Sequence, residues 1–234
     1  MKRQIKTTSD GSKTLYVNSL NESYHSLHGA LNEAKHVFID NGMKLINNYE
    51  INILELGFGT GLNVLAAFDE FLKNPNISKI NYYAIEKYPV TKDEIEELGY
   101  HRLFEGEDME YFYPKIHDSD WEKLVEIYPN FYLKKIKSDF FDLENLEIPP
   151  IDLVCFDCFG ARVQPDLWEK PLFEMISKKM RINSLLTTYS SKGSVRRILR
   201  ELGFRVEKKT GPPGKREMMV AIFEDTNFFN QTDV

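Results

Sequence analysis

An aspartate stands directly behind an apolar run in DLVCFDCFGARVQPDLW, residues 152–168. The run 153–156 has the composition of a buried strand, and a buried strand needs no carboxylate at its end. A carboxylate at such a position can attract a cationic group and accept a proton from it. Asp157 is therefore the first candidate for a catalytic residue. The alternative is a loop cap that accepts backbone N–H bonds.

Three glycines follow another apolar run, in ILELGFGTGLN, residues 53–63. Glycines let the backbone turn sharply and lie close to a ligand. The spacing is G-x-G-x-G, whereas dinucleotide binders use G-x-G-x-x-G, and Glu55 inside the preceding run also departs from that fingerprint. The candidate cofactor-binding residues of this loop are Gly57, Phe58, Gly59, Gly61 and Asn63.

Two further acids stand where predicted strands end. Glu86 follows the glycines by about 25 residues, where a carboxylate can accept both hydroxyls of a ribose. Asp139 can accept a hydrogen bond from an adenine amino group, with Phe140 beside it to pack on the ring. A methionine moiety carries no pyrophosphate and needs no phosphate-binding helix terminus, so the series fits S-adenosylmethionine better than NAD. Surface charge is the alternative for either acid taken alone.

Alternating strands and helices must position these residues. Apolar periodicity predicts strands at 51–56, 79–85, 131–136, 151–156 and 184–189, and helices at 62–72, 91–98, 168–180 and 194–202, the last capped by Ser194. Strands 204–209 and 218–223 are joined by a turn and predict an antiparallel hairpin at one edge. Residues 99–130 are hard to assign and are expected to add helices. The pattern predicts an α/β fold, a Rossmann-like, mostly parallel seven-stranded sheet with helices on both faces.

Composition indicates one globular domain over residues 1–234, with an N-terminal segment 1–50 and a Rossmann-like core 51–225. Hydrophobic residues make up 42% of the chain, and no apolar run approaches the roughly 20 residues that cross a bilayer. The basic N-terminus has no apolar stretch behind it, so no secretory signal is expected, and a cytoplasmic location is the default.

Cysteines and histidines offer little chemistry. Cys155 and Cys158 form a C-x-x-C, which can be redox-active or half of a zinc site. Residues three apart in a strand point to opposite faces, and no second pair completes a metal site, so packing is the favoured interpretation. The five histidines are expected to serve surface or local structure, and no metal is expected.

The net charge of −6 hides a basic region: residues 170–216 hold thirteen Lys or Arg against three Glu. Solvated helix faces are the ordinary explanation, and a polyanion-binding surface is the functional one.

The chain resembles the MnmC-like tRNA methyltransferases over nearly its whole length. The resemblance rests on SDGSKTLY (9–16), YHSLHGALNEAKHVFI (24–39), LELGFGTGLN (54–63), DLWEKPLF (166–173), TYSSKGSVRRILRELGF (188–204) and GPPGKREM (211–218). It implies the fold of a class I S-adenosylmethionine-dependent methyltransferase. It also implies methylation of the exocyclic amine of 5-aminomethyl-(2-thio)uridine at the tRNA wobble position.

The resemblance also implies residue roles. The family's Asp-Ala-Phe-Ala-Pro motif reads Asp157-Cys158-Phe159-Gly160-Ala161 here, and its aspartate is the catalytic one. The family's glycine pair before the fifth strand is replaced by Asn183-Ser184. Tyr24 and Glu33 match an N-terminal segment expected to lie over the cofactor. Because the chain ends at Val234, it is expected to lack the flavin-dependent oxidase domain that some family members carry.

An alkylamine resembles lysine in basicity, with a pKa of about 10 or somewhat lower, so the substrate amine arrives protonated and Asp157 can orient it and relay its proton. Partner contacts are expected with the tRNA anticodon loop and not with a membrane, and a monomer is the simplest assembly. Phe159 and Tyr189 are candidates to stack on the base, with core packing as the alternative. The candidate phosphate contacts are Lys192, Arg196, Arg197, Lys215 and Arg216.

Two other functions fit the same pattern. A methyltransferase or aminopropyltransferase-like enzyme for a small amine would need no basic face. A catalytically silent scaffold would use the fold only to bind RNA.

Overall fold

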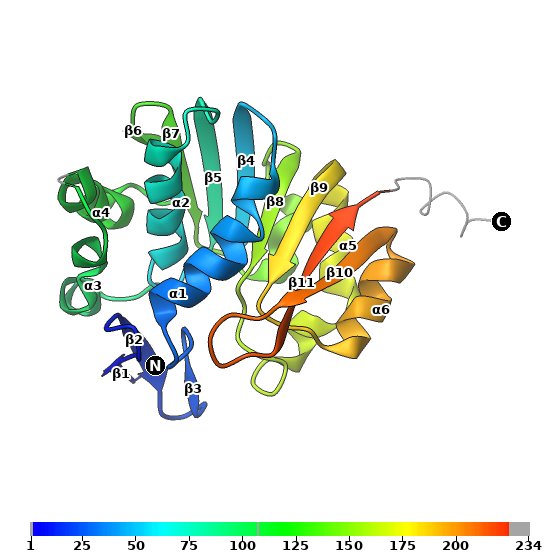
Figure 1. Ribbon diagram of the computed structural model, residues 1–234, viewed down its shortest axis with the longest axis horizontal. Helices are drawn as coiled ribbons and strands as arrows, with labels where there is room; N and C mark the ends of the chain where they lie inside the picture. The colour runs from blue at the N-terminus through cyan, green and yellow to red at the C-terminus, as the bar shows by residue number, and fades with distance from the viewer. Residues whose placement is uncertain (1, 107, 225–234) are drawn as a thin grey trace.

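A mixed sheet of eight strands forms the centre of the protein, in the order β10-β11-β9-β8-β4-β5-β7-β6 (Figure 1). The computed structural model describes residues 2–106 and 108–224, so the last ten residues of the expected domain lie outside the described residues. The strands are β4 (Glu50–Leu56), β5 (Lys79–Ile85), β6 (Leu124–Tyr128), β7 (Phe131–Ile136), β8 (Ile151–Phe156), β9 (Met180–Thr188), β10 (Phe204–Thr210) and β11 (Glu217–Phe223). The predicted edge hairpin is confirmed, because β11 pairs antiparallel with both β10 and β9.

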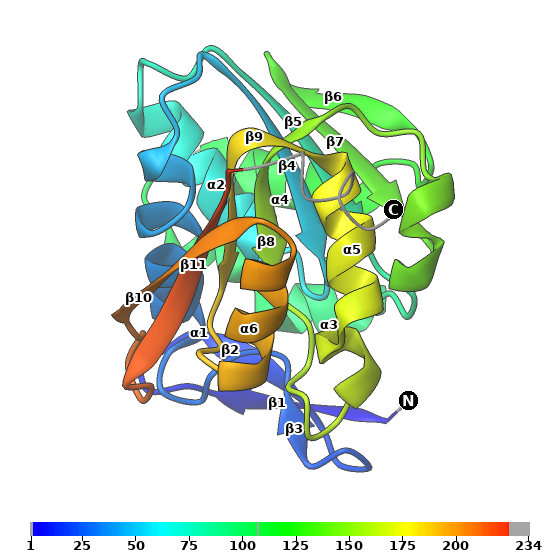
Figure 2. The same cartoon turned by 90° about the vertical axis from the view of Figure 1, so that its right-hand side faces the viewer.

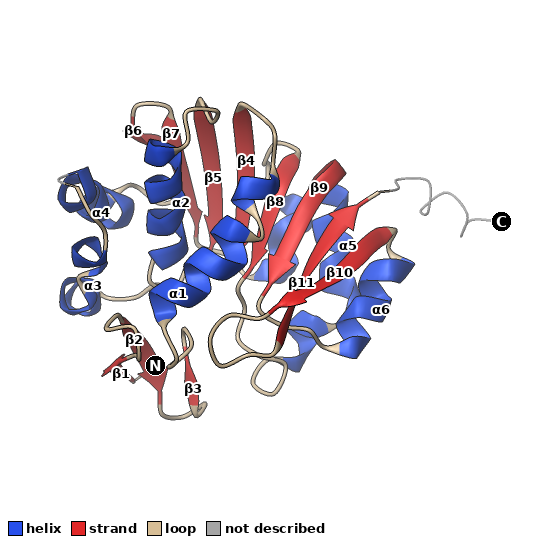
Figure 3. Cartoon of the chain, viewed as in Figure 1, coloured by secondary structure: helices blue, strands red, loops and turns tan. Residues whose placement is uncertain are grey.

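Helices cover both faces of the sheet (Figure 3). On one face lie α1 (Ala30–Ala34), which continues as a π-helical turn, η1 (Lys35–Asp40), and α2 (Leu62–Lys73), with α3 (Lys92–Leu98) and α4 (Asp108–Asp118) farther out. On the other face lie α5 (Lys170–Lys179) and α6 (Gly193–Glu201). Short 3-10 turns occupy η2 (Met43–Leu45), η3 (Tyr100–Leu103), η4 (Phe140–Asn145) and η5 (Pro165–Trp168).

Each face of the sheet has its own apolar core. Alternate residues of the central strands point to opposite sides, so Cys155 packs in the core under α2 while Cys158 packs in the core under α5 and α6. Both thiols are free and buried. The packing interpretation of the C-x-x-C is therefore confirmed.

The sequence prediction missed three local features. Strand β6 makes eight strands instead of seven; only one of its five residues is buried, so its apolar pattern is weak. Strand β9 begins at Met180 and not at 184, with Asn183 at a φ of 64° that asparagine tolerates. Helix α6 begins at Gly193 after Lys192, so Ser194 lies inside the helix and does not cap it.

Residues 99–130 combine helix and strand instead of helices alone. They form η3 and α4, and then β6, which turns back through Asn130 to pair antiparallel with β7. Three aromatic residues of this region, Tyr100, Phe112 and Tyr113, belong to the core, and the ring of Phe112 on α4 stacks on Phe68 of α2 with centroids 3.5 Å apart. This region completes one edge of the sheet.

A separate antiparallel sheet of three strands lies beyond the carboxyl ends of the parallel strands (Figures 1 and 2). It consists of β1 (Arg3–Thr7), β2 (Lys13–Val17) and β3 (Glu22–Ser23). Leu15 and Val17 of β2 are buried. The chain then passes through Tyr24 and His25 into α1, so the N-terminal sheet and the segment that follows it face the end of the sheet where α/β proteins bind ligands.

Candidate cofactor and catalytic site

A cleft opens at the carboxyl ends of the parallel strands, between them and the N-terminal sheet. It holds about 980 Å³ of empty space, its open mouth included. Ten of the predicted site residues line it: Tyr24, Gly57, Phe58, Gly59, Asn63, Glu86, Asp139, Phe140, Asp157 and Phe159. The remaining lining residues are Leu20, His25, Leu62, Lys87, Tyr88, Cys158, Gln164 and Leu167.

The glycine loop forms the floor of the cleft, with φ of 101° at Gly57 and 51° at Gly59. A Cβ on Gly57 would lie 2.7 Å from the backbone oxygen of Asp157, and one on Gly59 would lie 3.2 Å from the ring of Tyr24. A side chain at Gly57 would clash with backbone atoms, and one at Gly59 would crowd the Tyr24 ring and require a strained, left-handed φ. Gly61, with φ of 74°, is the residue before α2 and lies behind the cleft lining against His117.

Glu86 follows β5, and its carboxylate is already held by backbone amides. One oxygen accepts from Gly59 N at 3.1 Å and the other from Tyr88 N at 2.7 Å. Each carboxylate oxygen has a further lone pair, so the group can also accept from two hydroxyls in the cleft.

Asp139 follows β7 and has two partners. One oxygen accepts from Lys87 Nζ at 2.6 Å and the other from Phe141 N at 3.1 Å. The hydrogen bond from Lys87 is the main cause that lowers the pKa of Asp139, so this carboxyl is ionised. Lys87 and Asp139 both line the cleft.

Asp157 lies at the end of β8, with one oxygen 2.8 Å from Asn63 Nδ2. Burial, followed by the negative charge of Glu33, raises its pKa to about 7, while the Asn63 hydrogen bond and the charge of Lys215 act in the opposite direction. At neutral pH the carboxyl therefore exchanges readily between its acid and its base form.

The amide of Asn63 bridges two carboxyls. Its Nδ2 also donates to Glu55 Oε1 at 2.7 Å, inside the sheet behind the cleft. Glu55 is fully buried, and burial raises its pKa well above the ordinary range. Glu55 marked a departure from the dinucleotide fingerprint in the sequence; in the structure it fixes the orientation of the Asn63 amide.

Glu33 and Lys215 pair beside Asp157, outside the cleft lining. Lys215 Nζ lies 2.5 Å from Glu33 Oε1, and Glu33 Oε2 accepts from Ser26 N at 2.8 Å. The same ammonium lies 3.6 Å from the ring centre of Tyr189. The loop between β10 and β11 is thus held against α1 and the end of β9.

The loop after Asp157 is fixed at several points. Trp168 Nε1 donates to Phe159 O, and the Tyr189 hydroxyl donates to Cys158 O, both at 2.8 Å. The ring of Phe159 meets that of Tyr24 edge to face with centroids 5.1 Å apart. Phe159 therefore faces the cleft, whereas Tyr189 has its hydroxyl and one ring face engaged by the protein.

The remaining basic candidates lie outside the cleft lining. Lys192, Arg197 and Arg216 are exposed, and Arg196 is half-buried. They stand at the start of α6 and in the β10–β11 loop, on the side of the cleft where Lys215 lies. The structure thus separates an inner, acidic group of predicted residues from an outer, basic one.

The sequence analysis assigned His25 to surface or local structure, and the structure shows that this residue also lines the cleft. Its ring lies 3.2 Å from Thr14 Oγ1 and 3.4 Å from Thr60 Oγ1, and burial lowers its pKa to about 4. The imidazole of His25 is therefore neutral and forms part of the cleft wall. No spacing signal marked it, because Thr14 and Thr60 approach it only through the tertiary fold.

Among the described residues, no group of three His, Cys, Asp or Glu side chains could hold a metal ion. In the same part of the chain, no helix has the length and apolar character that crossing a bilayer requires.

Fold and cleft together define a class I S-adenosylmethionine-dependent methyltransferase. Residues 123–224 match a family described as "S-adenosyl-L-methionine-dependent methyltransferase". A crystal structure of MNMC2 from Aquifex aeolicus aligns with a TM-score of 0.73 at 26% identity, covering 98% of this chain and 75% of that one. A probable spermidine synthase from Corynebacterium glutamicum, at 13% identity and a TM-score of 0.53 over 96% of this chain and 77% of that one, shares the fold alone. The predicted fold class, enzyme class and cofactor are confirmed.

The expected resemblance to the MnmC-like methyltransferases is confirmed as well. The chain is 30% identical over 229 residues to the "tRNA 5-methylaminomethyl-2-thiouridine biosynthesis bifunctional protein MnmC" of Leptospira interrogans, with 87% of this chain covered. It spans about a third of the length of that relative (33%).

Proposed function

We propose that this protein methylates the exocyclic amine of 5-aminomethyl-(2-thio)uridine at the wobble position of tRNA, using S-adenosylmethionine. The observation that carries the proposal is the position of Asp157, in the cleft wall at the carboxyl edge of the sheet, within 2.8 Å of Asn63. The name of the Leptospira relative, which refers to tRNA 5-methylaminomethyl-2-thiouridine biosynthesis, supports the choice of substrate.

The residues of the cleft fit the cofactor. Gly57 and Gly59 both have positive φ and carry no Cβ, so the backbone there can lie against the methionine moiety. We assign the ribose hydroxyls to Glu86 and the adenine to Asp139 and Phe140, with Tyr24 and Asn63 near the methionine end. When bound, the cofactor supplies an electrophilic methyl group on a sulfonium.

Asp157 prepares the amine. The substrate ammonium has no lone pair, so it must lose a proton before its nitrogen can attack. In its ionised form Asp157 attracts the ammonium, orients it and takes up the proton. A carboxyl pKa of about 7, set mainly by burial, makes the group a better base than an ordinary aspartate.

The outer residues fit an RNA loop. Phe159 is available in the cleft for stacking on the wobble base, next to Tyr24. Lys192, Arg197 and Arg216 are exposed and suited to phosphates, with the half-buried Arg196 behind them. Because Glu33 and Tyr189 already engage the ammonium of Lys215, we assign Lys215 and Glu33 to setting the charge around Asp157.

We further propose that the chain works as one methyltransferase domain, in which residues 1–50 cover the cofactor site and residues 51–225 form the core. Tyr24 and His25 come from the same chain as Asp157, so a monomer suffices. We place the reaction in the cytoplasm, where tRNA is.

The test is transfer of labelled methyl groups to tRNA from cells that lack this activity, followed by nucleoside analysis. Label is expected in 5-methylaminomethyl-(2-thio)uridine. Asp157→Asn, which keeps the hydrogen bond from Asn63, is expected to lower turnover by roughly 10²–10⁴-fold while cofactor affinity changes little. Unreduced turnover would remove Asp157 from the mechanism. Methyl transfer to small amines at equal rates with and without tRNA would contradict the tRNA substrate.

A further inference from the structure

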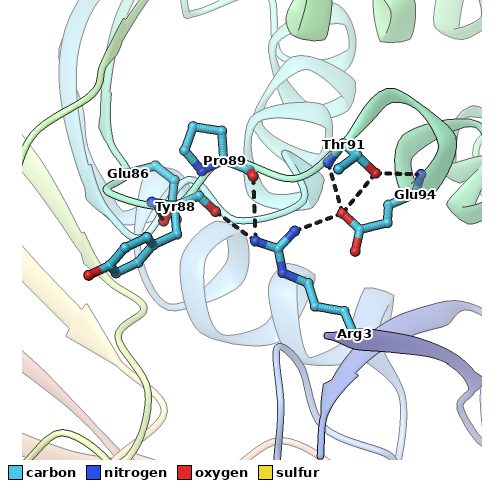
Figure 4. Close-up of polar contacts among 6 residues, drawn as sticks. All are labelled: Arg3, Glu86, Tyr88, Pro89, Thr91 and Glu94. Atoms are coloured by element: carbon cyan, nitrogen blue, oxygen red, sulfur yellow. Dashed lines mark hydrogen bonds and ion pairs between the residues drawn. The ribbon is translucent and has the colours of Figure 1, made fainter. Parts of the chain in front are cut away.

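Arg3 of β1 reaches from the N-terminal sheet into the loop between β5 and α3 (Figure 4). Its guanidinium donates to Glu94 Oε2 at 2.7 Å, to Tyr88 O at 2.9 Å and to Pro89 O at 3.4 Å. Only 6% of its side chain is exposed. A cation that is buried against two carbonyls and a carboxylate holds these three groups in one arrangement.

The loop that Arg3 holds is part of the cleft. It carries Glu86, Lys87 and Tyr88, which all line the cavity. Tyr88 N donates to Glu86 Oε1 at 2.7 Å, while Tyr88 O accepts from Arg3, so one peptide segment connects the guanidinium to the carboxylate (Figure 4). Arg3 itself does not line the cavity and therefore acts through other residues.

Both ends of the loop contact fixed structure. Behind Pro89, Thr91 and Glu94 form a capping box at the start of α3, and the same Glu94 oxygen that pairs with Arg3 accepts from Thr91 N at 2.8 Å. On the cleft side, the guanidinium carbon of Arg3 lies 5.7 Å from the ring centre of Tyr24, which packs over Gly59. Arg3 thus connects the helix start, the loop and the N-terminal wall of the cleft.

We propose that Arg3 is a positioning residue for the cofactor, fixing the loop of residues 86–91 against Tyr24 so that Glu86 faces the ribose. The inference rests on the proposed function, in which Glu86 receives the ribose hydroxyls. A loop that is ordered before the ligand arrives loses less conformational entropy on binding, so the tether increases affinity without touching the cofactor.

The geometry requires arginine. A guanidinium presents five N–H donors in a planar fork and can serve a carboxylate and neighbouring carbonyls at once, whereas a lysine ammonium is a compact point charge. Arg3→Lys keeps the positive charge next to Glu94 and Tyr24 but loses some of the N–H donors that serve the two carbonyls. Its effect is expected to fall between those of the wild type and Arg3→Ala.

The test is calorimetric titration of S-adenosylmethionine into the purified full chain. Arg3→Ala is expected to raise the Kd roughly tenfold, because the untethered loop must then be ordered when the cofactor binds, and Arg3→Lys to raise it less. Lys2→Ala is the matched control, because it removes one positive charge from an exposed neighbour and should leave the Kd unchanged. In methyl transfer, the KM for S-adenosylmethionine should rise by the same factor while kcat at saturation stays near the wild-type value.

A purely structural role gives a different result. A lower Tm with an unchanged Kd in Arg3→Ala, or a loss of kcat without a change in KM, would overturn the inference. Should Arg3→Ala not fold, Arg3→Lys and Glu94→Gln decide, because each keeps part of the network and should still weaken binding.

The titration also separates the inference from the proposed function. Cofactor binding that depends on Arg3 without methyl transfer to tRNA would refute the function alone. Methyl transfer to tRNA, together with a Kd for S-adenosylmethionine that is unchanged in Arg3→Ala, would refute the inference alone.

Discussion

At the scale of single residues, Asp157 combines a catalytic requirement with a cost in stability. A base that takes a proton from an amine works better when its pKa is high, and burial raises the pKa of a carboxyl. The same burial disfavours the ionised form in the folded protein. The residue that the mechanism needs therefore weakens the fold at the pH at which it acts.

Asp157→Asn is expected to stabilise the protein more at pH 8 than at pH 5. The folded-state pKa of about 7 lies above the ordinary value of 3.8, so the folded state binds this proton more tightly than the unfolded chain does. Its stabilising contribution is fully present below about pH 4 and is lost as the pH rises from there to about 7, whereas an amide loses nothing. Thermal unfolding should show a larger Tm gain at pH 8 than at pH 5, by about 2–4 °C for each kcal/mol of difference in stability. An equal gain at both pH values would contradict the raised pKa.

Site residues that a neighbouring sequence pattern marks were predictable, whereas site residues that only the tertiary fold brings to the cleft were not. Asp157 and Glu86 each follow an apolar run, and the rule that parallel strands end at one edge places them in one cleft. His25 lines the same cleft but follows no such run in the sequence. Arg3 gave no signal either, because its partners lie more than eighty positions away along the chain.

At the scale of elements, buried strands were predicted well and exposed ones poorly. Strands β7 and β8 have the predicted bounds, since their inward residues form apolar runs. Strand β6 and the small N-terminal sheet are mostly half-exposed, and their pattern is too weak for periodicity to detect. The N-terminal sheet, which lies over the cleft, is thus among the parts of the fold that are hardest to predict from the sequence.

Glu33 of α1 and Lys215 of the β10–β11 loop form an ion pair beside Asp157, and replacing either residue should shift the pKa of Asp157 in opposite directions. Glu33 raises and Lys215 lowers the pKa of Asp157, because one charge repels and the other attracts its ionised form. Glu33→Gln should therefore move the acid limb of the kcat/KM profile to lower pH, and Lys215→Met should move it to higher pH, each by roughly one pH unit.

The double variant Glu33→Gln/Lys215→Met is the control for this pair, since it removes both charges. The acid limb of its kcat/KM profile should return close to the position found for the wild type. The measurement is methyl transfer from pH 5.5 to 9 at saturating cofactor. Shifts in the same direction for both single variants would show that the pair only supports the loop.

At the scale of the whole molecule, charge is divided between two regions. The chain carries −6 overall, yet the segment 170–216 holds thirteen Lys or Arg against three Glu. The cleft lies between acidic residues on its inner side and the exposed cations of α6 and the β10–β11 loop. The sequence indicated this division, but only the fold places the basic residues beside the cleft, because loop 211–216 returns to α1.

Binding of tRNA should therefore depend on salt through a few named cations. The triple variant Lys192→Ala/Arg197→Ala/Arg216→Ala is expected to weaken tRNA binding at low salt and to reduce the slope of log K against log salt by roughly one for each phosphate that is no longer neutralised. Cofactor affinity should not change, because none of the three lines the cleft. Filter binding between 50 and 300 mM salt, about the range over which such interactions weaken, measures the slope.

The control triple Lys73→Ala/Lys92→Ala/Lys123→Ala removes the same charge from exposed positions near α2, α3 and β6, away from α6 in Figure 1. If both triples lose affinity equally, net charge alone governs binding and the face beside the cleft has no special part in it.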